Sequence, residues 1–196
     1  MKKTVKSGKI VDNVKNYIFG GIMTVEKNYF LRPAPELAPS MIGLLLCRRF
    51  EDGTVVKARI TETECYFGEE DTACHAHKGR TPRTDVMYLE GGRAYVYLCY
   101  GIHELLNVTT GRDGHPEAVL IRGVEGASGP GRVTKLLKID RSFNKLLLTE
   151  ENGLWLEEDG FKADTVCDKR VGIAYADEID REKPWRFIMA DIKNKS

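Results

Sequence analysis

Alternate residues between positions 54 and 66 pass from apolar side chains to carboxylates. A period of two in this segment predicts a strand whose one face points to the core. That face carries Thr54, Val56, Ala58, Ile60, Glu62, Glu64 and Tyr66. A carboxylate such as Glu64 at the end of an apolar face is partly desolvated, which raises its pKa and makes it a stronger base. On position alone, an ion pair of Glu64 with Arg59 or Arg122 is the favoured alternative.

Aromatic and basic residues gather at the ends of the predicted strands or in the loop that follows position 66. They are Tyr66, His75, Tyr95, Tyr97 and Arg122. Aromatic faces bind planar groups, and an arginine can hold an anion or a water. Their convergence predicts a pocket for a flat ligand.

The segment "CHAH" offers Cys74, His75 and His77 as metal ligands. Their spacing matches no closed zinc pattern, and the sequence has no second ligand cluster. We therefore predict no metal site. No glycine-rich phosphate-binding motif occurs either.

Basic residues are unevenly distributed, although the net charge is only +1. The loop "KGRTPR" presents Lys78, Arg80 and Arg83, which are candidates for phosphate contacts. A second set occurs at three- and four-residue spacing and predicts a stripe along one helix face within residues 129–148. It consists of Arg132, Lys135, Lys138, Arg141 and Lys145. A solvated helix face explains this stripe equally well.

The elements that must position these residues indicate an α+β fold. Residues 33–50 predict a short helix that passes into a strand, and "EDGTVV" predicts the turn of a hairpin. Residues 93–101 and 115–126 predict two more strands. Strands without regular alternation with helices favour α+β over a parallel α/β architecture.

Length and composition limit the class of protein. The 196 residues suffice for one domain with a real core, and 42% hydrophobic with 30% charged residues is ordinary for a globular protein. No apolar run is long enough to span a membrane. Five cysteines without CxxC pairing favour reduced thiols in a cytosolic or nuclear compartment.

Several segments, in this order, resemble the alkyladenine (3-methyladenine, methylpurine) DNA glycosylases. They are "ARITETECYFGEEDTACHAHKGRTPR", "AYVYLCYGIHELLNV", "AVLIRGVEG", "GPGRVTKLLKID" and "RVGIAYADE" with "KPWRF". The resemblance implies a single α+β domain around a curved antiparallel β-sheet with surrounding helices. We expect this domain at residues 23–196, preceded by a flexible N-terminal extension at residues 1–22.

The resemblance also implies roles for individual residues. Glu64 corresponds to the catalytic base, and Arg122 and the carbonyl of Val171 hold the attacking water. Tyr66, His75 and Tyr97 correspond to residues that stack on the base, and Asn107 to the residue that disfavours guanine. Tyr100 corresponds to the residue that intercalates into DNA, where we also expect Arg80 and Arg83.

The family's activity implies a monofunctional N-glycosylase of base excision repair. It would flip alkylated or deaminated purines out of duplex DNA and hydrolyse the N-glycosidic bond with a water activated by Glu64. No lysine neighbours Glu64 in a motif for Schiff-base chemistry, so no strand cleavage is expected. We expect no cofactor and no metal, double-stranded DNA as the partner, no membrane, and a monomer. The location would be cytoplasmic at the nucleoid in a prokaryote, or nuclear in a eukaryote.

Two other classes of protein remain open from the residues. A metal-dependent hydrolase would use Glu64, Cys74, His75 and His77. A non-catalytic nucleic-acid binding module would need the basic and aromatic residues but not Glu64.

Overall fold

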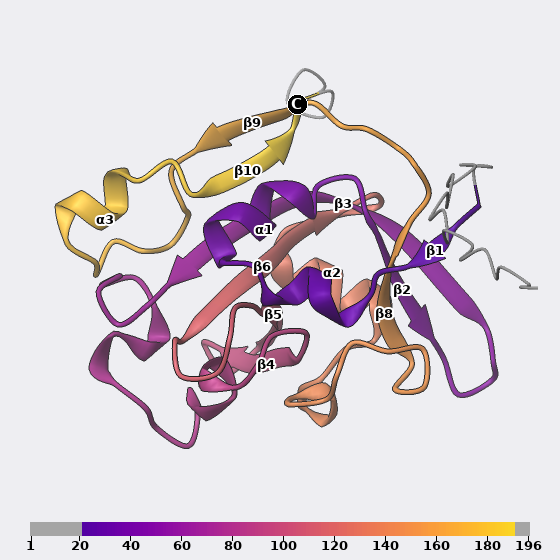
Figure 1. Ribbon diagram of the computed structural model, residues 1–196, viewed down its shortest axis with the longest axis horizontal. Coiled ribbons are helices and arrows are strands. Elements are labelled where there is room, and N and C mark those ends of the chain that lie inside the picture. The colour runs from indigo at the N-terminus through magenta and orange to yellow at the C-terminus, as the bar shows by residue number, and fades with distance from the viewer. Residues whose placement is uncertain (1–20, 191–196) are drawn as a thin grey trace, which may run out of the picture.

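A computed structural model describes residues 21–190 of the chain (Figure 1). The expected extension at 1–22 therefore lies outside the described residues except for its last two positions. The strands are β1 (Met23–Thr24), β2 (Leu45–Arg49), β3 (Val55–Phe67), β4 (Ala94–Cys99), β5 (His103–Thr109), β6 (Glu117–Val124), β7 (Ala127–Ser128), β8 (Leu154–Glu158), β9 (Thr165–Asp168) and β10 (Arg186–Met189). The α-helices are α1 (Ala34–Ser40), α2 (Pro130–Leu137) and α3 (Glu178–Glu182). Short 3₁₀ helices are η1 (Lys27–Leu31), η2 (His75–Lys78), η3 (Asp85–Tyr88) and η4 (Arg141–Phe143).

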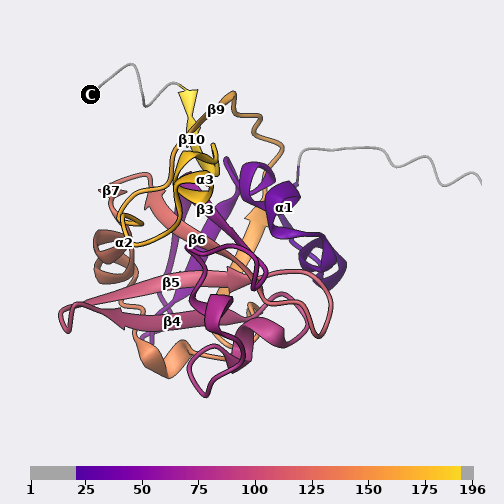
Figure 2. The same cartoon turned by 90° about the vertical axis from the view of Figure 1, so that its left-hand side faces the viewer.

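All strand pairs of the described residues are antiparallel, in one sheet with the order β1-β8-β2-β3-β6-β5-β4. β10 pairs with β3 and β9, and β7 pairs with β6. Figure 2 shows β4 and β5 running across the direction of β3, as in a strongly twisted sheet. The predicted α+β class, the hairpin around residue 52 and the short helix before β2 are confirmed. β5 is a strand that the sequence analysis did not predict.

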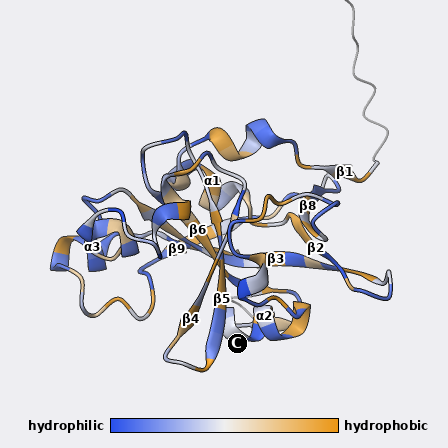
Figure 3. Cartoon of the chain, turned by 90° about the horizontal axis from the view of Figure 1, so that it is seen from below, coloured by the Kyte–Doolittle hydropathy of each residue, from blue (hydrophilic) through white to orange (hydrophobic). Residues whose placement is uncertain are grey.

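One large apolar cluster lies between the sheet and helices α1 and α2. Leu37 of α1 and Val133 of α2 pack there with the inward residues Leu106, Val119 and Ile121 of β5 and β6. Figure 3 shows hydrophobic residues concentrated in the central strands and hydrophilic residues around them. The opposite face of β4, β5 and β6 is therefore left for a second group of side chains, which forms the site described below.

The prediction that Ile60 and Glu64 share one face of β3 is wrong. The pairing of β3 with β6 shifts between Ile60 and Glu62 and again between Glu62 and Thr63, so that the alternation of faces changes there. Ile60 packs in the main core, whereas after the irregularity Cys65 does so. Glu64 consequently lies on the other face of the sheet, because the bulge rotates the strand by one position.

The predicted helix over residues 129–148 is also wrong in its length. α2 ends at Leu137, because Lys138 adopts left-handed backbone angles (φ 48°, ψ 50°) and caps the helix. η4 then begins at Arg141, and its N-cap Asp140 accepts a hydrogen bond from the backbone N–H of Ser142. The basic residues from 132 to 145 are therefore not one helix face.

Candidate active site

A cavity of about 940 Å³ opens on the face of β4, β5 and β6 that lies away from the main core. The predicted alternation holds in β6, where Ala118, Leu120 and Arg122 line the cavity and their neighbours face the core. Tyr95 and Tyr97 of β4 line it in the same way. The remaining lining side chains discussed below are Tyr66, His75, Arg83, Tyr100, His103, Asn107, Arg132, Lys135 and Val171.

Glu64 lies one layer behind the cavity surface and is 0% exposed. Its Oε1 accepts a hydrogen bond from the backbone N–H of Val171 (2.7 Å) and lies 3.5 Å from a guanidinium nitrogen of Arg122. Its Oε2 accepts one from the hydroxyl of Tyr66 (2.9 Å). Burial raises the pKa of Glu64, and the charge of Arg122 and the two hydrogen bonds oppose that rise only in part. Glu64 therefore has a fixed orientation, and its burial makes it a stronger base.

Glu62 has a different environment, although it is only two residues away. Its Oε1 accepts hydrogen bonds from Arg122 Nε and Arg186 Nη1, both at 3.1 Å. Arg122 therefore bridges the carboxylates of Glu62 and Glu64. The ion pair of Glu64 with Arg122, which was the alternative to a role as base, is thus present, and Glu64 is also buried. Arg59, the other candidate partner, instead binds Asp159 at 2.7 Å.

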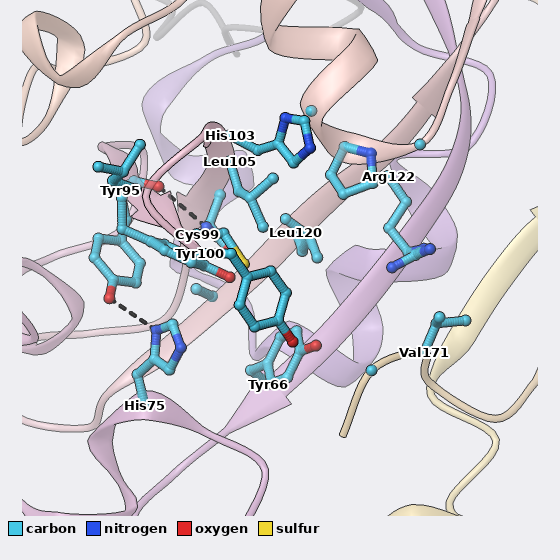
Figure 4. A pocket seen from close by; sticks show the side chains of 18 of the residues that line it. Tyr66, His75, Tyr95, Cys99, Tyr100, His103, Leu105, Leu120, Arg122 and Val171 are labelled. Atoms are coloured by element: carbon cyan, nitrogen blue, oxygen red, sulfur yellow. Dashed lines mark hydrogen bonds between the residues drawn. The ribbon is translucent and has the colours of Figure 1, made fainter. Parts of the chain in front are cut away.

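The aromatic wall of the cavity is formed by His75, Tyr95 and Tyr97. The Nδ1 of His75 is hydrogen-bonded to the hydroxyl of Tyr95 (2.9 Å; Figure 4). The His75 ring meets the Tyr97 ring edge-on, with the ring centroids 4.6 Å apart. Burial, with the charge of Arg83 as a second cause, lowers the pKa of His75 to about 4. The imidazole is therefore neutral at physiological pH. In Figure 4, this wall lies opposite Arg122 and Val171.

Asn107 of β5 lines the cavity next to the aromatic wall. Its Nδ2 donates to the backbone carbonyl of Tyr95 (3.1 Å), and the residue is 4% exposed. The amide group is thus fixed in orientation at the cavity surface, where it can discriminate between groups on a bound ring.

Tyr100 stands at the tip of the turn between β4 and β5 and is 87% exposed. Its φ is +52° and that of Gly101 is +74°, while the N–H of Ile102 donates to the carbonyl of Cys99. Tyrosine rarely adopts such angles, and an unfavourable backbone of this kind is found preferentially at functional sites. The turn presents an apolar ring to solvent beside the cavity.

Arg170 is a site residue that the sequence analysis missed. Its fully buried guanidinium binds both carboxylate oxygens of Asp71 (2.6 and 2.8 Å) and lies 4.9 Å from the centre of the Tyr66 ring. It directly precedes Val171, so the clamp fixes both the ring and the backbone N–H that bind Glu64. Asp71 lies 99 residues earlier in the chain, and no local pattern in the sequence connects the two.

The two arginines of the loop before η3 have separate surroundings. Arg80 forms an ion pair with Asp85 (2.8 Å) and lies over the Tyr88 ring. Arg83 lies over the Tyr97 ring and lines the cavity. Arg132 in the first turn of α2 and Lys135 in its last turn also line the cavity.

The donor set of a metal-dependent hydrolase does not come together in the structure. Nδ1 of His77 is hydrogen-bonded to the carbonyl oxygen of Glu69, whereas His75 is engaged with Tyr95. Among residues 21–190, no group of three histidine, cysteine, aspartate or glutamate side chains is placed to hold a metal ion.

Comparison with known proteins agrees with this site. The model of the family "Methylpurine-DNA glycosylase (MPG)" matches residues 28–128 and 124–193. A protein of Borrelia garinii subsp. bavariensis is 43% identical over an alignment of 182 positions, and the match covers 86% of this chain and 97% of that protein. Proteins of Psychrobacter cryohalolentis (40% identity; 85% and 92% of the two chains) and Methanocella arvoryzae (39%; 82% and 90%) are similar as well. All three carry the name "Putative 3-methyladenine DNA glycosylase".

The family match and the relatives define a DNA-repair hydrolase that cleaves a base from its sugar. The chain belongs to the methylpurine-DNA glycosylase family. The prediction of a monofunctional DNA glycosylase is thereby confirmed at the level of the enzyme class, and DNA follows as the substrate. None of the helices among the described residues is long and apolar enough to cross a membrane.

Proposed function

We propose that this glycosylase flips a damaged purine, alkylated or deaminated, out of duplex DNA into the cavity. It then hydrolyses the N-glycosidic bond with a water that Glu64 activates. The observation that carries the proposal is the burial of Glu64 behind an aromatic cavity, with both carboxylate oxygens engaged. A buried carboxylate with a raised pKa is suited to general-base catalysis.

Each lining residue receives a role from its position. Tyr66, His75 and Tyr97 would stack on the flipped base, where each aromatic contact contributes about 1–3 kcal/mol. Tyr100 at the hairpin tip would fill the gap left in the duplex, because an exposed apolar side chain is suited to enter a base step. Extrusion of a base costs a few kcal/mol, which these contacts offset.

The reacting atoms lie on the opposite side from the aromatic wall. Arg122 and the backbone N–H of Val171 both contact Glu64 Oε1. Arg122 and the carbonyl of Val171 would hold the attacking water beside this oxygen. Loss of the water's proton to Glu64 would accompany attack on C1′ as the bond to the purine breaks. A purine alkylated at N3 or N7 is cationic in DNA and departs as a neutral base, so a single carboxylate suffices where ordinary glycosidases need two. A neutral lesion such as hypoxanthine must also take up a proton as it leaves, and solvent would supply that proton.

Asn107, whose amide is held by its hydrogen bond to Tyr95, would exclude normal guanine by a clash with the exocyclic amino group. An Asn107→Ser variant should therefore release guanine-type bases faster relative to adenine-type bases. Base release from duplexes with each lesion measures this, and an unchanged ratio would remove Asn107 from the selectivity role.

The proposed chemistry is tested with Glu64→Gln, assayed for base release from a duplex that contains ethenoadenine or hypoxanthine. We expect lesion binding within about tenfold of the wild type and excision reduced about 10²- to 10⁴-fold, as loss of a general base implies. Glu62→Gln is the matched control and should reduce excision much less. If the two variants behave alike, Glu64 is not the base. If neither substitution affects turnover, the attacking water is activated by another group.

A further inference from the structure

Arg83 brings an unmatched positive charge into the wall of the cavity. Its guanidinium carbon lies 4.9 Å from the centre of the Tyr97 ring. No carboxylate among residues 21–190 forms an ion pair with it, whereas Arg122 is paired with Glu62 and Glu64. Arg170, on the ring of Tyr66, is neutralised by Asp71.

Arg80 shows what a paired arginine of the same loop looks like. It also lies over a tyrosine ring, at 5.2 Å from the centre of Tyr88, but Asp85 neutralises its charge. Arg80 does not line the cavity. Of these two arginines, Arg83 therefore carries the charge that is not neutralised by a carboxylate and that lies beside the cavity.

The positive charge of Arg83 would repel a cationic base in the cavity. A purine stacked on Tyr97 would lie about 3.5 Å from its ring, so the guanidinium would remain within about 9 Å of the purine. At the effective dielectric constant of partly buried sites, repulsion over this distance corresponds to about tenfold in binding of a cation relative to a neutral ring. The guanidinium also occupies the electron-rich ring of Tyr97, which would otherwise attract a cationic base.

The surroundings of Arg83 respond to the same charge. His75, next to Tyr97 in the aromatic wall, has its pKa lowered by burial and then by Arg83. The wall therefore already disfavours one cation, the imidazolium.

We propose that Arg83 is a specificity-determining residue that biases the cavity toward neutral purine lesions and against cationic ones. This inference rests on the proposed function and deepens it by assigning the charge of the preferred base. Both lesions of the test derive from adenine, so the selectivity role of Asn107 does not enter.

The experiment compares the release of 3-methyladenine, cationic in DNA, from methylated duplex DNA with the release of neutral ethenoadenine from an oligonucleotide duplex. The ratio of the two single-turnover efficiencies is determined for each variant. In Arg83→Gln this ratio should rise about tenfold in favour of 3-methyladenine. Arg83→Lys should keep the wild-type ratio. Arg80→Gln, the matched control, should leave the ratio within twofold even if it weakens DNA binding.

A ratio for Arg83→Gln within twofold of the wild type overturns the inference and leaves the proposed function intact. The same holds if Arg83→Lys behaves like Arg83→Gln, because geometry rather than charge then matters. A wild type that releases only 3-methyladenine also overturns it. A wild type that releases neither base overturns the proposed function together with the inference. Since Arg83 is an exposed loop residue, the variants should fold normally.

Discussion

Glu64 combines the role of a base with a cost in stability. Its burial disfavours the ionised form and raises its pKa above the value in the unfolded chain. Between these two pKa values, the folded state binds more protons than the unfolded state, so the free energy of unfolding decreases as pH rises through this window. The buried carboxylate is therefore destabilising above this window, where it is ionised.

A first prediction follows for stability. Glu64→Gln keeps the shape of the side chain and removes the buried charge, so it should raise the melting temperature at pH 7 and change it less at pH 4. Glu62→Gln should lower the melting temperature, because it leaves Arg122 and Arg186 without their shared partner. Thermal unfolding at the two pH values measures both effects. A lower melting temperature for Glu64→Gln at pH 7 would contradict a net desolvation penalty.

The same pKa shift predicts a pH–rate profile. Glu64 acts as a base only when ionised, so the single-turnover excision rate should decline toward acid with a midpoint above the usual glutamate value. His75 titrates near pH 4, so its protonation should contribute only at the acidic end. The residual rate of Glu64→Gln should lack this acidic limb; if it retains the limb, another group is responsible.

At the scale of elements, local patterns in the sequence predict the sheet but not the irregularity in it. The sequence predicts that Tyr95 and Tyr97 share one face of a strand, and in the structure both line the cavity. The change of face between Ile60 and Glu64 is not visible, because it depends on the pairing of β3 with β6. Arg170 was missed for the same reason, since its partner Asp71 is distant in sequence. The proposed role of Asn107, and the choice of Glu64 rather than Glu62 as the base, were available only from the resemblance to a family.

Gly123 is the residue of β6 that permits this irregularity. A Cβ at this position would lie 2.9 Å from Thr61 Oγ1 and 3.1 Å from the Cβ of Glu62. Gly123→Ala should therefore displace β3 next to Glu64, lower the free energy of unfolding by about 1–3 kcal/mol and reduce excision at least tenfold. Gly53→Ala is the control, since its φ of +83° makes it strained while its Cβ would meet nothing within 4 Å. If Gly123→Ala and Gly53→Ala are equally stable and excise the base at comparable rates, the irregularity in β3 is not needed for catalysis.

Tyr100, at the tip of the hairpin of β4 and β5, gives a prediction about DNA binding. Tyr100→Ala removes an exposed ring and no charge, so lesion binding and excision should fall while the salt dependence of binding stays that of the wild type. Lys78→Ala, in the neighbouring loop, should show the opposite pattern if it contacts a phosphate. Binding of a lesion duplex over a range of salt concentrations distinguishes the two. Unchanged excision by Tyr100→Ala would exclude an intercalating role.

At the scale of the whole molecule, a net charge of +1 must be arranged so that one face holds DNA. Residues 150–159 contain five acids and no base, and they include β8, at the end of the sheet away from β4. Arg132 and Lys135 lie at the cavity on α2. α2 ends at Leu137, and the basic residues that follow it do not line the cavity. Arg141, for example, is paired with Glu104 at 3.0 Å. The charge of the DNA face therefore comes from a few cations around the cavity.

The salt dependence of binding tests this arrangement. For duplex DNA, log K falls with log salt by about 0.9 per neutralised phosphate. The double variant Arg132→Ala with Lys135→Ala should reduce the slope by about one to two, and should weaken binding equally for damaged and undamaged duplexes, since phosphates carry no information about the base. Lys138→Ala with Arg141→Ala removes the same charge from beyond the end of α2, and should leave the slope within about half a unit of the wild type. If both pairs reduce the slope equally, the DNA covers the whole basic segment, and the end of α2 does not limit the binding face.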